Sequence, residues 1–231
     1  MRQPAFARRA FRWIVKAIIV FIVGSIVWVG LYRFVPPPVT ATMIANLVEG
    51  RGITKDWMAL DDMSPNMARA AIAAEDGNFC KHNGFDFKAI QRAMESNFKG
   101  VRKIRGGSTI SQQTAKNAFL WQNGGYLRKG LEAWFTLLIE TLWTKQRIME
   151  VYLNIAETGI GTYGANAGSM RYFGHDASRL TRAEAARIAA VLPLPKKREA
   201  RAPSGFTRRY GHMISRRIGQ VSRYGQDSCL E

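Results

Sequence analysis

The chain contains little of what marks several protein classes. Two cysteines and three histidines in 231 residues are too few for a disulfide-dense fold, and neither cysteine has the spacing of a metal ligand. No low-complexity tract and no repeat of about 20 to 50 residues occurs, which argues against a solenoid. Patterns typical of β-strands are scarce. We therefore expect a mainly α protein with a few short strands at most.

Acidic residues are also in short supply. The 17 Asp and Glu are outnumbered by 34 Lys and Arg, which gives a formal net charge of +17 at pH 7. Such a charge attracts polyanions or anionic surfaces, and nucleic acid and membrane lipid are the two obvious candidates. Because 47% of the residues are hydrophobic, the chain can form a packed core, and disorder is not expected.

The N-terminal sequence favours the membrane. Residues 17–31, AIIVFIVGSIVWVGL, are uncharged, and the apolar stretch over residues 13–35 reaches the roughly 20 residues that cross a bilayer. Basic residues cluster before this stretch, whereas only Arg33 follows it closely. The positive-inside rule then predicts a single-pass inner-membrane protein with a cytoplasmic N-terminus and a periplasmic domain. The alternative is a cleaved signal peptide, for which VTA at residues 39–41 is a poor cleavage site.

Composition divides the chain into five segments. They are a cytoplasmic basic leader (1–12), a transmembrane anchor (13–35), a linker (36–45), a folded domain (46–200) and a basic C-terminal segment (201–231). The linker contains three consecutive prolines, which end the membrane helix and stiffen the connection. The basic run from Lys196 onward has two interpretations, a surface for anionic headgroups or partners and a solvated basic face.

Helix signals dominate the folded domain. Ser64 and Pro65 predict a helix start, and Gly77 ends that helix. Thr181 and Glu184 form a capping-box pattern. The predicted helices are residues 65–76, residues 86–98 with Gly100 behind them, a helix that starts at Ser108 or Thr109 after Gly106 and Gly107, residues 127–154, and residues 181–192.

The two cysteines, Cys80 and Cys229, leave their pairing open. In an exported domain they could form a disulfide, but their wide separation in sequence indicates no framework.

Adjacent acids, Glu75 and Asp76, end the alanine-rich helix. One turn before Glu75 lie Ala71 and Ile72, so its carboxylate is expected at the edge of an apolar surface, where burial raises its pKa. A carboxylate with a raised pKa suits a general base, and the charge of Asp76 would raise the pKa further. The alternative is a solvated helix end.

Two later segments carry phosphate-binding and ion-pair patterns. The helix start after Gly107 exposes backbone N–H groups, and Gln112, Gln113 and Lys116 form a polar face that could hold a diphosphate. Arg128 and Lys129 flank Glu132 at helical spacing. A plain glycine turn and an ordinary surface ion pair are the alternatives.

Taken in order, these segments resemble a known family. The motifs are EDGNFCKHNGFD (75–86), GGSTISQQTAKN (106–117), RKGLE (128–132) and KQRIMEVYLN (145–154), with GTYGANAGSMRYFG and LTRAEAARIAAVLPLP behind them. They resemble the successive signatures of the bacterial peptidoglycan glycosyltransferases over roughly residues 60–200. Because 231 residues leave little room for a second catalytic domain, the resemblance is to monofunctional members. Ser111 stands where the family usually has Thr, and Met149 where Leu is common.

The resemblance implies a fold and a reaction. The fold is a lysozyme-like, mainly α glycosyltransferase domain with a small membrane-proximal lobe, preceded by one transmembrane helix. The reaction is polymerisation of lipid II into linear glycan strands through β-1,4 bonds, with inversion and release of undecaprenyl diphosphate, in cell wall biosynthesis.

The resemblance also implies residue roles. Glu75 is the general base, and Glu132 assists the leaving group directly or organises the cations around it. Lys116, Arg128 and Lys129 bind the diphosphate. The other implied substrate contacts are Ser108, Thr109, Gln112 and Gln113 on the donor side and Asp76, Phe79 and His82 on the acceptor side.

No cofactor and no metal site are required by the sequence, although a divalent cation, Mg or Mn, on the substrate diphosphate fits the resemblance. The implied partners are lipid II, the growing glycan, the membrane, and proteins of cell-wall synthesis or division, but not nucleic acid.

Two rival functions remain. A lysozyme-like glycan-cleaving enzyme shares the fold type and also uses carboxylates, but it needs no cations for a diphosphate. An anchored protein that binds anionic lipid or nucleic acid through its charge would need neither Glu75 nor Glu132.

Overall fold

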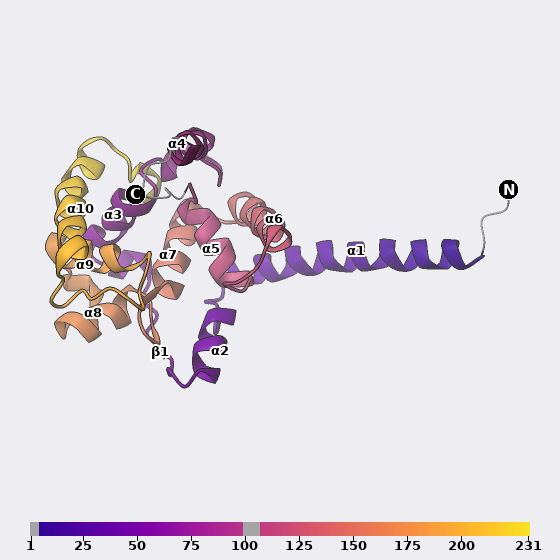
Figure 1. Ribbon diagram of the computed structural model, residues 1–231, viewed down its shortest axis with the longest axis horizontal. Helices are drawn as coiled ribbons and strands as arrows, with labels where there is room; N and C mark the ends of the chain where they lie inside the picture. The colour runs from indigo at the N-terminus through magenta and orange to yellow at the C-terminus, as the bar shows by residue number, and fades with distance from the viewer. Residues whose placement is uncertain (1–4, 99–106) are drawn as a thin grey trace.

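The computed structural model describes residues 5–98 and 107–231, and helices make up most of it (Figure 1). Gly100 and Gly106, named above as sequence signals, lie outside these residues. The α-helices are α1 (Ala5–Tyr32), α2 (Ala41–Val48), α3 (Pro65–Glu75), α4 (Phe87–Phe98), α5 (Ile110–Phe119), α6 (Tyr126–Leu142), α7 (Lys145–Ile155), α8 (Ala165–Phe173), α9 (Arg182–Val191) and α10 (Gly205–Arg223). The 3₁₀ helices are η1 (Leu60–Asp62), η2 (Phe79–Lys81), η3 (Ala177–Arg179) and η4 (Ser228–Leu230).

Local capping explains where several helices begin. Pro65 occupies the first turn of α3 after Ser64, as predicted. Thr181 begins α9 with a complete capping box, in which its side chain accepts from the Glu184 N–H and Glu184 bonds the Thr181 N–H in return. The helix predicted over residues 86–98 is α4. These starts depend on side chains close in sequence, so they can be predicted without knowledge of the fold.

The single helix predicted over residues 127–154 is wrong. The structure has two helices there, because α6 ends at Leu142 and Trp143 adopts an extended backbone. Thr144 then caps α7, its hydroxyl accepting from the N–H of Arg147. The apolar residues continue on both sides of this break, so the hydrophobic periodicity alone did not indicate it.

Three short strands form one small sheet. They are β1 (Thr54–Lys55), β2 (Glu157–Gly159) and β3 (Thr162–Tyr163), in the order β1-β3-β2. β1 pairs with β3 in parallel and β2 pairs with β3 antiparallel. The fold is therefore mainly α with a few short strands, as predicted.

One helix among the described residues is long and apolar enough to span a membrane, and it covers Arg8–Tyr32 within α1. α1 projects away from the rest of the chain, and only its C-terminal part contacts the folded domain (Figure 1). There α1 packs against α6. Trp134 Nε1 donates to Ser25 Oγ at 3.0 Å, and Trp143 Nε1 donates to the Val29 carbonyl at 2.8 Å. The apolar helix is thus joined to the domain by side-chain contacts as well as by the chain.

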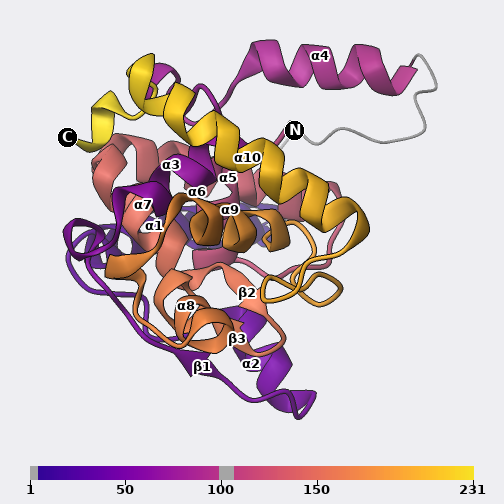
Figure 2. The same cartoon turned by 90° about the vertical axis from the view of Figure 1, so that its left-hand side faces the viewer.

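The last long helix belongs to the core of the domain. α10 packs on α9 and α3, and Ile214, Ile218 and Val221 are buried in the same hydrophobic cluster as α3 and α9. α10 and α9 lie together on the face opposite to the one from which α1 projects (Figure 2). Residues 201–231, predicted as a separate basic segment, thus include a helix whose apolar face completes the core.

The two cysteines form a disulfide. Cys80 in η2 and Cys229 in η4 are bonded, with their Cα atoms 5.4 Å apart and 149 positions apart in sequence. The disulfide fastens the C-terminal end of the chain to the segment that follows Glu75. Sequence spacing left the pairing open, because the two residues meet only after α10 has packed on α3.

Replacing both cysteines by serine is expected to lower the free energy of unfolding by about 2–5 kcal/mol, because the disulfide closes a long loop in the unfolded chain. Thermal melts of the full-length protein in detergent, followed by circular dichroism, measure the effect. Wild type melted with a reductant should resemble the double variant. A melt of the double variant that matches oxidised wild type would contradict a stabilising role.

Candidate active site

Glu75 is the last residue of α3, and its carboxylate is held from α5. Gln113 Nε2 donates to Glu75 Oε2 at 2.9 Å. The other oxygen, Oε1, is buried and has no hydrogen-bond partner among the described residues. A buried carboxylate oxygen without a donor is costly, and it keeps an unused capacity to accept a hydrogen bond.

The surroundings of Glu75 raise its pKa, as predicted. Burial is the largest cause, and the negative charge of Asp76 acts in the same direction. The hydrogen bond from Gln113 and the positive charges of Arg198 and Lys116 oppose the shift. The carboxyl group is therefore a better proton acceptor than an exposed glutamate.

Asp76 supports the structure around Glu75. The residue is 5% exposed, and its Oδ2 accepts from the backbone N–H of Ile110 at 3.0 Å, in the first turn of α5. His82 Nε2 lies 3.0 Å from Oδ1, while His82 Nδ1 is buried without a partner among the described residues. A carboxylate at a helix N-terminus satisfies free N–H groups and favours the helix dipole. Asp76 thus links the end of α3 to the start of α5.

Phe79 lies beneath this region. Its side chain is fully buried, and the Lys145 ammonium lies 4.5 Å from the centre of its ring. Lys145 Nζ also donates to the His82 carbonyl at 2.7 Å. Phe79 therefore packs under the loop that carries His82 and does not line a pocket described below.

The polar residues at the start of α5 cap the helix, line a pocket, or do both. Thr109 and Gln112 form a capping box, and Thr109 Oγ1 also donates to the Gly84 carbonyl at 2.7 Å. Ser108 is exposed and lines a pocket of about 230 Å³ with Glu75 and Asp76. Of the four residues implied for the donor side, Ser108 and Thr109 thus line the pocket of Glu75, and Gln113 bonds its carboxylate.

Glu132 sits in a cationic cluster on α6. It is 3% exposed, Arg128 Nη1 donates to its Oε2 at 2.8 Å, and the Lys129 ammonium bonds Oε1. Lys129 itself is about half exposed, with 49% of its side chain accessible. Glu132 is therefore fully engaged, and it is a buried anchor for two cations, the mostly buried Arg128 and the more exposed Lys129.

Lys116 connects Glu75 and Glu132 electrostatically. Burial lowers the pKa of the Lys116 ammonium, and the positive charges of Arg128 and Lys129 lower it further. The carboxylates of Glu132 and Glu75 both act in the opposite direction. The two carboxylates and three cations singled out from the sequence thus belong to one electrostatic unit.

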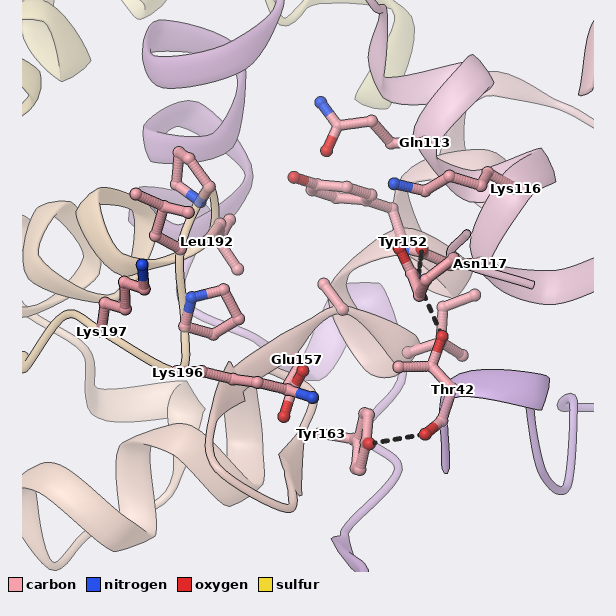
Figure 3. Close-up of a pocket in the computed structure, with 16 residues that line it drawn as sticks. Thr42, Gln113, Lys116, Asn117, Tyr152, Glu157, Tyr163, Leu192, Lys196 and Lys197 are labelled. Atoms are coloured by element: carbon pink, nitrogen blue, oxygen red, sulfur yellow. Dashed lines mark hydrogen bonds between the residues drawn. The ribbon is translucent and has the colours of Figure 1, made fainter. Parts of the chain in front are cut away.

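A larger pocket of about 390 Å³ opens beside this unit. Figure 3 shows Gln113, Lys116 and Tyr152 on one side of it and Leu192, Lys196 and Lys197 on the other. Because Gln113 lines this pocket and also bonds Glu75, Glu75 lies between it and the smaller pocket at Ser108.

Three residues near Glu75 were not assigned a role from the sequence. Tyr152 is 1% exposed, its hydroxyl has no partner among the described residues, and burial raises its pKa strongly, with the charge of Glu75 adding to the shift. Burial and Glu75 also raise the pKa of Tyr210 to about 12. Arg198 acts on Glu75 as a positive charge. Tyr152 and Arg198 lie in motifs already noted, but their proximity to Glu75 is a result of tertiary packing.

No group of three or more potential metal ligands occurs among residues 5–98 and 107–231. The free oxygen of Glu75 and the engaged carboxylate of Glu132 do not form a cage. Nothing in this part of the chain therefore marks a resident metal centre.

Known proteins resemble this chain over most of its length. The family model described as Transglycosylase matches residues 41–217. A protein of Caulobacter vibrioides named biosynthetic peptidoglycan transglycosylase is 53% identical over 226 residues, which cover 97% of this chain and 98% of that protein. A Pseudomonas aeruginosa protein of the same name is 47% identical over 229 residues, with 96% and 97% covered. One of Xanthomonas campestris is 45% identical over 231 residues, with 97% and 94% covered.

The comparisons and the geometry agree. The family model covers every residue of the site described above, and the relatives align across the apolar helix as well as the folded domain. A polymerising transglycosylase explains the cations around Glu132, and none of these relatives is named as a glycan-cleaving enzyme. The chain belongs to the transglycosylase family.

Proposed function

We propose that the protein polymerises lipid II into linear peptidoglycan glycan strands. The observation that carries this proposal is Glu75, a half-buried residue with a raised pKa and a buried, unpartnered oxygen, which lines one pocket and adjoins a second through Gln113. A base in this setting is matched to removing a proton from a sugar hydroxyl. The nearby cations are matched to a diphosphate leaving group.

Glu75 acts as the general base. Its carboxylate takes the proton of the 4-hydroxyl of the acceptor sugar as that oxygen attacks the anomeric carbon of the donor. A new carbon–oxygen bond forms while the bond from the anomeric carbon to the diphosphate breaks, and the diphosphate leaves with the electron pair. Attack from the face opposite the leaving group inverts the α linkage to β. The two pockets beside Glu75 provide room for the two sugars.

The cations stabilise the departing diphosphate. Lys116, Arg128 and Lys129 bind it, and Glu132 holds Arg128 and Lys129 in place through the bonds described above. In a partly buried site such charges stabilise developing negative charge more than in water. A divalent cation, Mg²⁺ or Mn²⁺, would accompany the substrate diphosphate and supply further positive charge.

The remaining site residues position these groups. Ser108 and Gln113 contact the donor side, whereas Thr109 and Gln112 hold the start of α5 through their capping box. On the acceptor side Asp76 and His82 shape the loop that follows Glu75, and the buried Phe79 acts through packing.

The enzyme works at the inner membrane. The apolar helix α1 crosses it with its basic N-terminal end in the cytoplasm, and the catalytic domain lies in the periplasm. The contacts of Trp134 and Trp143 with α1 support a retained anchor, because cleavage as a signal peptide would remove them. The anchor holds the site next to its lipid-linked substrate. Proteins of cell-wall synthesis or division are the expected protein partners.

Replacing Gln113 by methionine is expected to move the acidic limb of the pH–rate profile to higher pH. The base must be ionised, so activity falls as the pH drops through the pKa of Glu75, and the Gln113 hydrogen bond lowers that pKa. Polymerisation rates of wild type and variant measured from acidic to neutral pH test this. Gln91, an exposed residue of α4 that bonds Glu95, provides the control, since Gln91→Met should leave the limb in place. An unshifted limb in Gln113→Met would argue against Glu75 as the titrating base.

The proposal as a whole is tested by the product. Purified protein in detergent is incubated with labelled lipid II, and the polymer is digested with a β-1,4-specific muramidase. We expect a polymer that the muramidase cuts completely to disaccharide units. If no polymer forms and the protein instead degrades finished glycan, the protein cleaves glycan and the proposal is wrong.

A further inference from the structure

A second pocket, separate from the site of Glu75, lies between α9 and α10. It has a volume of about 260 Å³. Its polar lining consists of Arg187 from α9, Arg201 from the connection between α9 and α10, and Arg208, His212 and Ser215 from α10. The rest of its lining is two alanines, a proline and a glycine, and no acidic residue takes part.

The three arginines of this pocket carry unneutralised charge. Within residues 5–98 and 107–231, neither Arg187, Arg201, Arg208 nor His212 forms an ion pair. The nearby Glu199 accepts from the backbone N–H of Arg201, not from its guanidinium. By contrast, Arg69, Arg128 and Arg147 each pair with a carboxylate. Three guanidinium groups that converge on one pocket without an acid repel one another and favour an anionic ligand.

The position of the pocket limits what that anion can be. α9 and α10 lie on the face that is turned away from α1 (Figures 1 and 2). If α1 crosses the membrane, this face points toward the cell wall. The chain from Leu192 to Lys197 lines the large pocket beside Gln113, and its continuation through Arg201 to Pro203 lines the arginine pocket. The same connection therefore joins the two pockets.

We propose that the arginine pocket binds the free carboxylates of the short peptides carried by the glycan product. The inference rests on the proposed function. A strand that leaves the site of Glu75 along the residue 192–203 connection would bring its peptides to α10. There the guanidinium groups grip a carboxylate by paired hydrogen bonds, and the alanines, proline and glycine leave space for a small apolar group beside it.

Carboxylate fits this position better than phosphate. The diphosphate of the substrate leaves with its lipid and stays at the membrane, as do phospholipid headgroups, whereas the pocket lies on the side away from α1. Peptide carboxylates are the anionic groups that the product carries away from the membrane.

The test measures binding of preformed glycan to the full-length protein in detergent. The probe is soluble, peptide-bearing glycan strands with acetylated amines, used with free carboxylates or after conversion of the carboxylates to methylamides. The variants are Arg201→Gln/Arg208→Gln and a control pair, Arg209→Gln/Arg223→Gln, which removes two exposed charges of α10 outside the pocket. We expect about tenfold weaker binding for the pocket pair and for methylamide strands, since each loses charge-assisted hydrogen bonds. The control pair should bind within about twofold of wild type. Thermal melts check that both pairs fold.

Several results would overturn the inference. Equal losses of glycan affinity in the pocket pair and the control pair would indicate a diffuse attraction between the basic surface and the strands. Unchanged binding of the methylamide strands would exclude carboxylate as the bound group. Displacement by inorganic phosphate at concentrations where acetate has no effect would assign the pocket to phosphate. Equally tight, arginine-dependent binding of polyglutamate would indicate an acidic protein partner. Because the strands are made beforehand, failure of lipid II polymerisation would refute the proposed function separately, while carboxylate-independent binding by an active enzyme would refute only this inference.

Discussion

The Glu75→Gln variant is expected to polymerise lipid II about 10³-fold more slowly than wild type. Glutamine has nearly the same shape but cannot accept the proton of the sugar hydroxyl, and general bases typically contribute about 10²- to 10⁴-fold. The environment of the Glu75 carboxylate strengthens this expectation, since the buried oxygen Oε1 has no alternative partner among the described residues. Initial rates with labelled lipid II at saturating and low substrate give kcat and kcat/KM, and both should fall.

A matched control separates loss of the base from loss of an acid at the protein surface. Glu95 on α4 is exposed and bonded only to Gln91 among the contacts described, so Glu95→Gln should polymerise at the wild-type rate. Full activity in Glu75→Gln would contradict the assignment of Glu75 as the base, regardless of the activity of the control variant.

Stability provides an independent check on the same variant. The folded protein raises the pKa of Glu75, mainly through burial, so ionised Glu75 disfavours the folded state. Protonated Glu75 stabilises the folded protein relative to ionised Glu75. This contribution is fully present at pH values below the ordinary glutamate pKa, and it is lost as the pH rises through the raised pKa of the folded state. Glutamine carries no charge, and Glu75→Gln should therefore melt at or above the wild-type temperature at neutral pH. A lower melting temperature would show that inactivity reflects damage to the fold.

The second large effect is expected at Lys116. Replacing it by methionine should lower kcat/KM about 10²- to 10³-fold, the range seen when one preorganised donor to a developing anion is removed. Lys116→Arg keeps the charge and should recover part of this loss. Because burial lowers the pKa of Lys116, the charged form disfavours folding at neutral pH, and methionine should not lower the melting temperature.

Lys81 is the control for Lys116. It is exposed at the end of η2 and lines none of the pockets described above, so Lys81→Met should retain wild-type activity. Lys197 would be a poor control, since it lines the large pocket opposite Lys116 (Figure 3). Equal losses in the Lys116 and Lys81 variants would contradict a specific role in binding the diphosphate.

The sequence predicted those features of the site that depend on neighbours along the chain. The apolar residues one turn before Glu75 predicted a carboxylate at the edge of an apolar surface with a raised pKa, and the structure confirms the raised pKa. Arg128 and Lys129 pair with Glu132 as their helical spacing predicted. The depth of burial of Glu132 was not predicted, because it depends on helices that pack against α6.

Contacts between distant segments were beyond prediction from one sequence. Gln113 reaches Glu75 across 38 positions, and Cys80 meets Cys229 across 149. Arg198 belongs to the basic run for which a solvated face was one interpretation. In the structure it donates to the Ala190 carbonyl at 2.6 Å, and its positive charge lowers the pKa of Glu75. In each case the partner is set by tertiary packing, for which local periodicity contains no signal.

The most direct test of the account follows both halves of lipid II in one reaction. Lipid II labelled on the sugar and, separately, on the diphosphate is incubated with purified wild-type protein. We expect one undecaprenyl diphosphate to be released for each glycosidic bond formed in the polymer, and both products to fall together in Glu75→Gln. Release of the lipid diphosphate without polymer, or neither product while finished glycan is cut, would contradict the claim that this site joins sugars by displacing a diphosphate.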